Sequence, residues 1–142
     1  MTTMSRALLE GWYVLIVDDD MHSMDVARRI LKFYGADVYT AANGLLALDI
    51  IQHARPAFIV SDIEMPVMDG WEFVQRLKNN RETMDIPVIA LTAYAMVGDR
   101  EKAIAAGFHN YLSKPLNPAT FMSELVTLLE DVPALNFSVE DK

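Results

Sequence analysis

Residues 13–20 read Tyr-Val-Leu-Ile-Val-Asp-Asp-Asp, a run of five apolar residues followed at once by three acids. A short charge-free run rich in β-branched residues predicts a strand that is covered on both faces, as in parallel sheets. The residues that follow, 24–34, carry apolar side chains at helical spacing, and Gly35 predicts the end of that helix. A strand followed by a helix is a βα unit, so the beginning of the chain indicates an α/β fold.

The same unit recurs along the chain. The strands predicted in this way cover residues 13–17, 37–40, 57–61, 88–91 and 111–112. The helices predicted between and after them cover about 24–34, 45–53, 71–77, 97–106 and 118–129. Four of the strands are continuous apolar runs, whereas the second alternates and is therefore expected at an edge of the sheet. The pattern predicts a doubly wound α/β domain around a five-stranded parallel sheet.

Composition limits the classes of function that remain. The chain has 142 residues, 52% of them hydrophobic, which is enough for one domain with its own core. A net charge of −8 opposes direct binding to nucleic acid. The absence of cysteine excludes disulfides, thiol nucleophiles and cysteine-ligated zinc, and agrees with a reducing compartment.

We expect three segments: an N-terminal arm at 1–11, the compact domain at 12–131 and a C-terminal tail at 132–142. Ala7, Leu8 and Leu9 give the arm apolar side chains that can pack on the domain edge. No secretory signal and no apolar run of membrane-spanning length is visible. The expected location is the cytoplasm, with no membrane partner.

Polar residues follow the predicted strands at their carboxyl ends, where open α/β sheets bind ligands. They are Asp18, Asp19, Asp20, Ser61, Asp62, Glu64, Thr92, Ser113 and Lys114. Carboxylates placed together repel one another unless a cation lies among them, so the set predicts a hard divalent ion, most plausibly Mg²⁺. A hydroxyl and an ammonium beside that ion suit the oxygens of a phosphoryl group, with an aspartate as its acceptor.

Four segments in order resemble the signatures of bacterial response-regulator receiver domains. They are residues 14–20 (Val-Leu-Ile-Val-Asp-Asp-Asp), 61–70 (Ser-Asp-Ile-Glu-Met-Pro-Val-Met-Asp-Gly), 90–93 (Ala-Leu-Thr-Ala) and 113–115 (Ser-Lys-Pro). The resemblance implies a flavodoxin-like fold of strand order 2-1-3-4-5. It also implies a phosphorylation switch that catalyses its own phosphorylation and dephosphorylation, with no separate turnover of small molecules.

Carried over position by position, the resemblance assigns a role to each site residue. Asp62 would be the phospho-acceptor and would bind Mg²⁺ together with Asp19. Asp18 would act through a metal-bound water, and Glu64 would offer its backbone carbonyl. Thr92 and Lys114 would each hold a phosphoryl oxygen, and the Lys114-Pro115 peptide would be cis. Tyr111 would be the aromatic switch that is coupled to Thr92.

The resemblance also implies partners. A histidine kinase or phosphotransfer protein would supply the phosphoryl group, and an output protein or a second copy of the chain would bind the face formed by residues 97–130. Glu64 and Tyr94 flank the expected path of the hydrolytic water, which suggests slow self-hydrolysis. Asp20 and the pair Asp69-Gly70 are better explained as helix starts than as site residues.

Two alternatives stay open at this point. One is an Mg²⁺-dependent phosphohydrolase that acts through an aspartyl phosphate, although position 64 is glutamate and 142 residues leave no room for a large cap domain. The other is a receiver fragment of a hybrid kinase or of a larger regulator. Turnover of small phosphomonoesters, or its absence, would separate the first alternative from a receiver.

Overall fold

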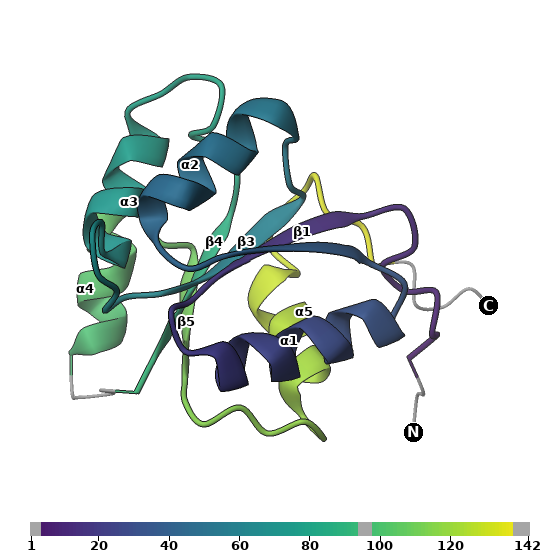
Figure 1. The fold of residues 1–142 in the computed structure, drawn as a ribbon. Coiled ribbons are helices and arrows are strands. Elements are labelled where there is room, and N and C mark those ends of the chain that lie inside the picture. Colours follow the sequence, from purple (N-terminus) through teal and green to yellow (C-terminus); the bar gives the residue numbers. More distant parts are fainter. Residues whose placement is uncertain (1–3, 94–97, 138–142) are drawn as a thin grey trace.

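The structure is a computed structural model that describes residues 4–93 and 98–137. Five parallel strands form one sheet in the order β2-β1-β3-β4-β5, and helices cover both of its faces (Figure 1). The expected α/β fold and strand order are therefore confirmed. No helix among the described residues is long and apolar enough to cross a bilayer.

The bounds of the elements lie close to those expected. The strands are β1 (Tyr13–Val17), β2 (Asp37–Ala41), β3 (Phe58–Asp62), β4 (Val88–Thr92) and β5 (Asn110–Ser113). The helices are α1 (Met21–Phe33), α2 (Gly44–His53), α3 (Gly70–Lys78), α4 (Asp99–Ala106) and α5 (Phe121–Leu129). β2 lies at an edge of the sheet, as its alternating sequence predicts.

Two apolar cores lie on opposite faces of the sheet. Alternate residues of a strand point to opposite faces, so Val14 and Ile16 enter one core while Leu15 and Val17 enter the other. The first core lies under α1 and α5, and the second lies under α2, α3 and α4 (Figure 1). Because both faces are covered, the inner strands contain almost only buried side chains.

One helix begins later than its sequence predicts. Pro118 was expected to open the last helix, but residues 118–120 form a turn and α5 starts at Phe121. The side chain of Asn117 accepts from the Ala119 N–H over 3.0 Å, and its carbonyl accepts from Thr120 and Phe121. Asn117 thus satisfies the amides of Ala119 and Thr120 in the turn and that of Phe121, the first residue of α5.

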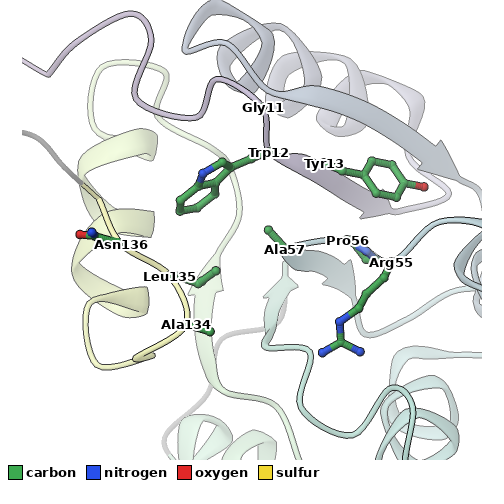
Figure 2. Close-up of a pocket in the computed structure, with 9 residues that line it drawn as sticks. All are labelled: Gly11, Trp12, Tyr13, Arg55, Pro56, Ala57, Ala134, Leu135 and Asn136. Carbon is green, nitrogen blue, oxygen red and sulfur yellow. The ribbon is translucent and has the colours of Figure 1, made fainter.

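The described parts of both terminal segments pack on the domain. Leu9 is completely buried and Leu8 is 8% exposed. In the tail, Phe137 contacts Trp12 with the ring centroids 5.0 Å apart. Figure 2 shows the open hollow that remains between this tail, Trp12 and Arg55. The hollow lies at the amino-terminal edge of the sheet, opposite the acids, and no carboxylate of the described residues lines it.

Candidate functional site

The parallel register brings four polar side chains to one edge of the sheet. Val17 is level with Ser61, so Asp18 emerges beside the end of β3, where Asp62 is the last residue. Thr92 ends β4 and is level with Ser113, the last residue of β5, so Lys114 lies directly beyond the end of that strand. Residues that are up to 96 positions apart in the chain therefore meet at the carboxyl ends of the strands.

Lys114 joins the two buried carboxylates. Its Nζ lies 3.0 Å from Asp18 Oδ2 and 3.2 Å from Asp62 Oδ2. Asp18 is completely buried and Asp62 is 6% exposed, so the Lys114 ammonium attracts both carboxylates through a medium that screens weakly. The Lys114-Pro115 peptide is cis, as the family resemblance implies.

Burial and charge shift two pKa values at this site. Burial raises the pKa of Asp18 to about 6, although the Asp20 N–H and the Lys114 ammonium both lower it. Burial also lowers the pKa of Lys114, but the carboxylates of Asp18 and Asp62 outweigh that effect and the net shift is upward. The Lys114 ammonium therefore keeps its charge, and the buried Asp18 carboxyl is easier to protonate than an aspartate in water.

The acids also fit a divalent cation. One carboxylate oxygen from each of Asp18, Asp19 and Asp62 lies within 4.8 Å of the others. Oδ2 of Asp18 is buried and accepts no well-directed hydrogen bond from the described residues, even though Lys114 Nζ lies close to it. A set of oxygen donors that includes such an atom suits Mg²⁺, which prefers carboxylates and retains several waters.

Two further acids lie near the site without joining this cluster. Asp20 caps α1, because its carboxylate accepts from the His22 N–H over 3.1 Å and from Ser23 Oγ over 3.0 Å. Its expected role as a helix start is confirmed. The side chain of Glu64 is exposed two residues beyond Asp62, which leaves its backbone carbonyl as the group proposed for the metal.

Thr92 and Tyr111 are buried on the neighbouring strands β4 and β5. Thr92 is 3% exposed and Tyr111 is 8% exposed. The Tyr111 hydroxyl is buried and has no hydrogen-bond partner among the described residues, and the Arg100 guanidinium lies 5.7 Å from the centre of its ring. Tyr94, named above beside the hydrolytic water, and Val97, the first residue of the expected output face, lie outside the described residues.

Gly70 is a positioning residue that the sequence analysis missed. Asp69 caps α3 by accepting from the Glu72 N–H over 2.9 Å, which confirms the expected helix start. A Cβ on Gly70, however, would lie only 2.4 Å from the Asp62 carbonyl oxygen. Only glycine permits the loop after β3 to fold back this tightly. The sequence did carry a signal for this role, because glycine is a poor helix former and yet stands at the first position of the predicted helix start.

Comparisons with known proteins agree with this geometry. Residues 14–126 match the family model described as the response regulator receiver domain. The polar-differentiation response regulator DivK of Brucella anthropi is 37% identical over 83% of this chain and 96% of its own. The chemotaxis response regulator CheY4 of Vibrio cholerae is 34% identical, with a TM-score of 0.77 over 89% of this chain and all of its own.

A third similar protein binds a metal ion. It is the receiver domain of a sensor histidine kinase from Pseudomonas aeruginosa, with a magnesium ion coordinated in its active-site cleft. It is 30% identical to this chain, with a TM-score of 0.75 over 85% of this chain and 99% of its own. The acidic pocket of Asp18, Asp19 and Asp62 is compatible with the same ion.

Proposed function

Because the chain belongs to the response-regulator receiver family of two-component signalling, we propose that Asp62 accepts a phosphoryl group from a phosphohistidine and thereby switches a protein contact. The observation that carries the proposal is the Lys114 ammonium, which lies within 3.2 Å of both Asp18 and Asp62. This arrangement supplies a nucleophilic carboxylate and a fixed positive charge beside it.

Asp62 is a better acceptor than Asp18. Asp18 is completely buried, so its carboxylate oxygens are closed to an incoming phosphoryl group. Asp62 ends β3 with a small exposed area, and its Oδ1 accepts from the Ile63 N–H over 2.8 Å. That bond fixes the rotation of the carboxylate and leaves Oδ2 beside Lys114.

In the proposed transfer, Asp62 Oδ2 forms a bond to phosphorus while the bond from phosphorus to the donor imidazole nitrogen breaks. The leaving electron pair stays on the imidazole. Lys114 and the Thr92 hydroxyl would donate to the phosphoryl oxygens, where negative charge is concentrated. When held by Asp19, Asp62 and the Glu64 carbonyl, with Asp18 acting through a metal-bound water, Mg²⁺ would add Lewis-acid stabilisation of those oxygens.

The switch would connect Thr92 with Tyr111. A buried hydroxyl without a partner costs about 1–3 kcal/mol, and the Tyr111 hydroxyl is of this kind among the described residues. A rotamer that exposes the hydroxyl is therefore within reach in the unphosphorylated chain. Movement of Thr92 toward a phosphoryl group on Asp62 would favour the inward position of the ring, since β4 and β5 are neighbours.

The partners follow from the proposed role. A histidine kinase or phosphotransfer protein would donate the phosphoryl group, and an output protein or a second copy would bind the face formed by residues 97–130. A cytoplasmic location and the division into arm, domain and tail at residues 11 and 131 also remain part of the proposal. The buried Leu9 and the contact of Phe137 with Trp12 support two terminal segments that pack on the receiver body.

Intact-mass spectrometry tests the acceptor directly. The chain is incubated with phosphoramidate, with and without Mg²⁺, and compared with Asp62→Asn. A gain of one phosphoryl group, about 80 Da, that requires both Mg²⁺ and Asp62 is expected. An unchanged gain in Asp62→Asn would refute the acceptor, and steady release of phosphate from small phosphomonoesters would favour the phosphohydrolase alternative. Asp20→Asn is the matched control, because Asp20 lies beside the cluster as a helix cap.

A further inference from the structure

The loop between β3 and α3 holds an exposed apolar side chain in a strained backbone conformation. Val67 has a φ of 70°, a left-handed value that β-branched residues rarely adopt. The Met68 N–H donates to the Pro66 carbonyl over 2.7 Å, so the chain reverses in a γ-turn centred on Val67, a strained form when φ is positive. The side chain is 76% exposed, and packing within the described chain does little to offset this strain.

Val67 and Met21 stand out among the exposed apolar residues. Of the described large hydrophobic side chains, these two are the most exposed, at 76% and 77%, and the others that are exposed reach only 45–51%. Met21 directly follows the three acids 18–20, and Val67 lies in the loop that follows Asp62. β1 and β3 are neighbours, so both residues lie at the edge of the sheet that carries the acidic pocket.

The start of α2 adds a third exposed apolar side chain to this edge. The Gly44 N–H donates to the Met68 carbonyl over 3.1 Å, which ties the first turn of α2 to the loop containing Val67. Leu45, the next residue, is 51% exposed. We call Met21, Leu45 and Val67 the apolar rim. All three belong to segments that directly follow β1, β2 and β3 at their carboxyl ends.

The charge at this edge determines what can cover the rim. Asp19, Asp20 and Glu64 are exposed there, and the chain as a whole has a net charge of −8. An acidic mouth repels small, dianionic phosphodonors from solution. It complements a protein surface on which apolar and basic side chains surround the reactive group. A protein donor that brings phosphorus within bonding distance of Asp62 must also cover the residues around the mouth.

We propose that Val67, together with Met21 and Leu45, is the contact by which this chain selects a protein phosphodonor, one whose phosphohistidine is surrounded by apolar and basic side chains. The inference rests on the proposed function of Asp62. Val67 takes no part in the transfer. It positions the donor, and the burial of its side chain in the complex offsets the strain of its turn. It is therefore a specificity-determining residue for protein donors.

Two kinds of donor separate docking from chemistry. The histidine kinases and phosphotransfer proteins of the source organism, labelled with radioactive ATP, serve as protein donors, and phosphoramidate with Mg²⁺ serves as the small donor. Val67→Asn removes the apolar side chain and retains a residue that tolerates the left-handed conformation. Val67→Gly is a second variant, in which the turn carries no strain. Met84→Gln is the matched control, because Met84 is an exposed apolar residue (45%) in the loop between α3 and β4.

The expected result is a selective loss. Transfer from the protein donor that is fastest on the parent chain slows about tenfold in both Val67 variants, equivalent to about 1.4 kcal/mol. Transfer from phosphoramidate stays within about twofold, and Met84→Gln matches the parent with both donors. Equal slowing with both donors, an unaltered rate with the protein donor, or no protein donor faster than phosphoramidate would each overturn the proposal. None of these three outcomes would prevent phosphoramidate from phosphorylating Asp62, so failure of the docking proposal can be distinguished from failure of the proposed function.

Discussion

Replacing Gly70 by alanine is expected to lower the free energy of unfolding by about 2 kcal/mol or more, because the new methyl group would meet backbone on two sides. Its Cβ would lie 2.4 Å from the Asp62 carbonyl oxygen and 2.8 Å from Ile63 Cα. A carbon–oxygen contact normally begins at about 3.3 Å, so the two segments must separate by about 0.9 Å. Overpacking of this kind costs about 3 kcal/mol, of which the better helix propensity of alanine returns up to about 1 kcal/mol.

Gly44→Ala is the matched control for this prediction. Gly44 is the first residue of α2 as Gly70 is of α3, so the two substitutions change helix propensity equally. A Cβ on Gly44 would lie 2.9 Å from Met68 Cγ, 3.0 Å from Met68 Sδ and 3.0 Å from Phe73 Cβ. The flexible Met68 side chain can move aside, and we expect a loss of about 1 kcal/mol or less for this variant.

Urea denaturation and thermal unfolding measure both variants. A loss of 2 kcal/mol corresponds to a fall of about 8 °C in Tm for a domain of this size. Because the clash displaces the backbone of Asp62 itself, Gly70→Ala should also slow phosphorylation by phosphoramidate, whereas Gly44→Ala should not. Equal losses of stability in the two variants, or a Gly70→Ala chain within about 0.5 kcal/mol of the parent, would refute the reasoning.

Three further outcomes are expected. Mg²⁺ at 100 times its Kd should raise the free energy of unfolding by about 2.7 kcal/mol. Asp19→Asn lacks one of the three acids, so calorimetry should show a smaller gain for this variant at the same Mg²⁺ concentration. An equal gain would contradict the metal site. Asp20→Ala should lower the free energy of unfolding by about 1 kcal/mol, because α1 loses its cap. Mass spectrometry should show that this variant is still phosphorylated, and loss of phosphorylation would place Asp20 in the site. Phe137→Ala should shift the fluorescence of Trp12 to longer wavelength, since it removes the ring 5.0 Å from the indole; an unchanged spectrum would mean that the tail does not cover Trp12 in solution.

The acidic pocket shows how far sequence reasoning reaches. Asp18, Asp62, Thr92 and Lys114 could be placed on one edge because each follows a predicted parallel strand, and strand direction alone brings such positions together. Asp20 could also be set apart as the cap of α1, since a cap depends on local sequence. That Asp18 is completely buried while Asp19 is exposed depends on what packs over each side chain.

Helix boundaries show the same limit. Asp20 and Asp69 act as the helix caps that local sequence predicts, because a cap bonds to amides only a few residues away. Pro118 did not open α5, because residues 118–120 form a turn in which Asn117 accepts from the Ala119 and Thr120 amides. Regular helix begins only at Phe121, which is completely buried.

By itself the sequence determined the alternation of strands and helices, the parallel sheet and the identity of the polar residues at its carboxyl edge. These features follow from apolar periodicity and chain direction, which act between near neighbours. Only the tertiary structure decided that Lys114 reaches Asp18 and Asp62, that Gly70 lies against the Asp62 carbonyl and that Val67 is left exposed in a strained turn. Each of these depends on the distance between segments far apart in the chain, and packing fixes such distances to within about 1 Å.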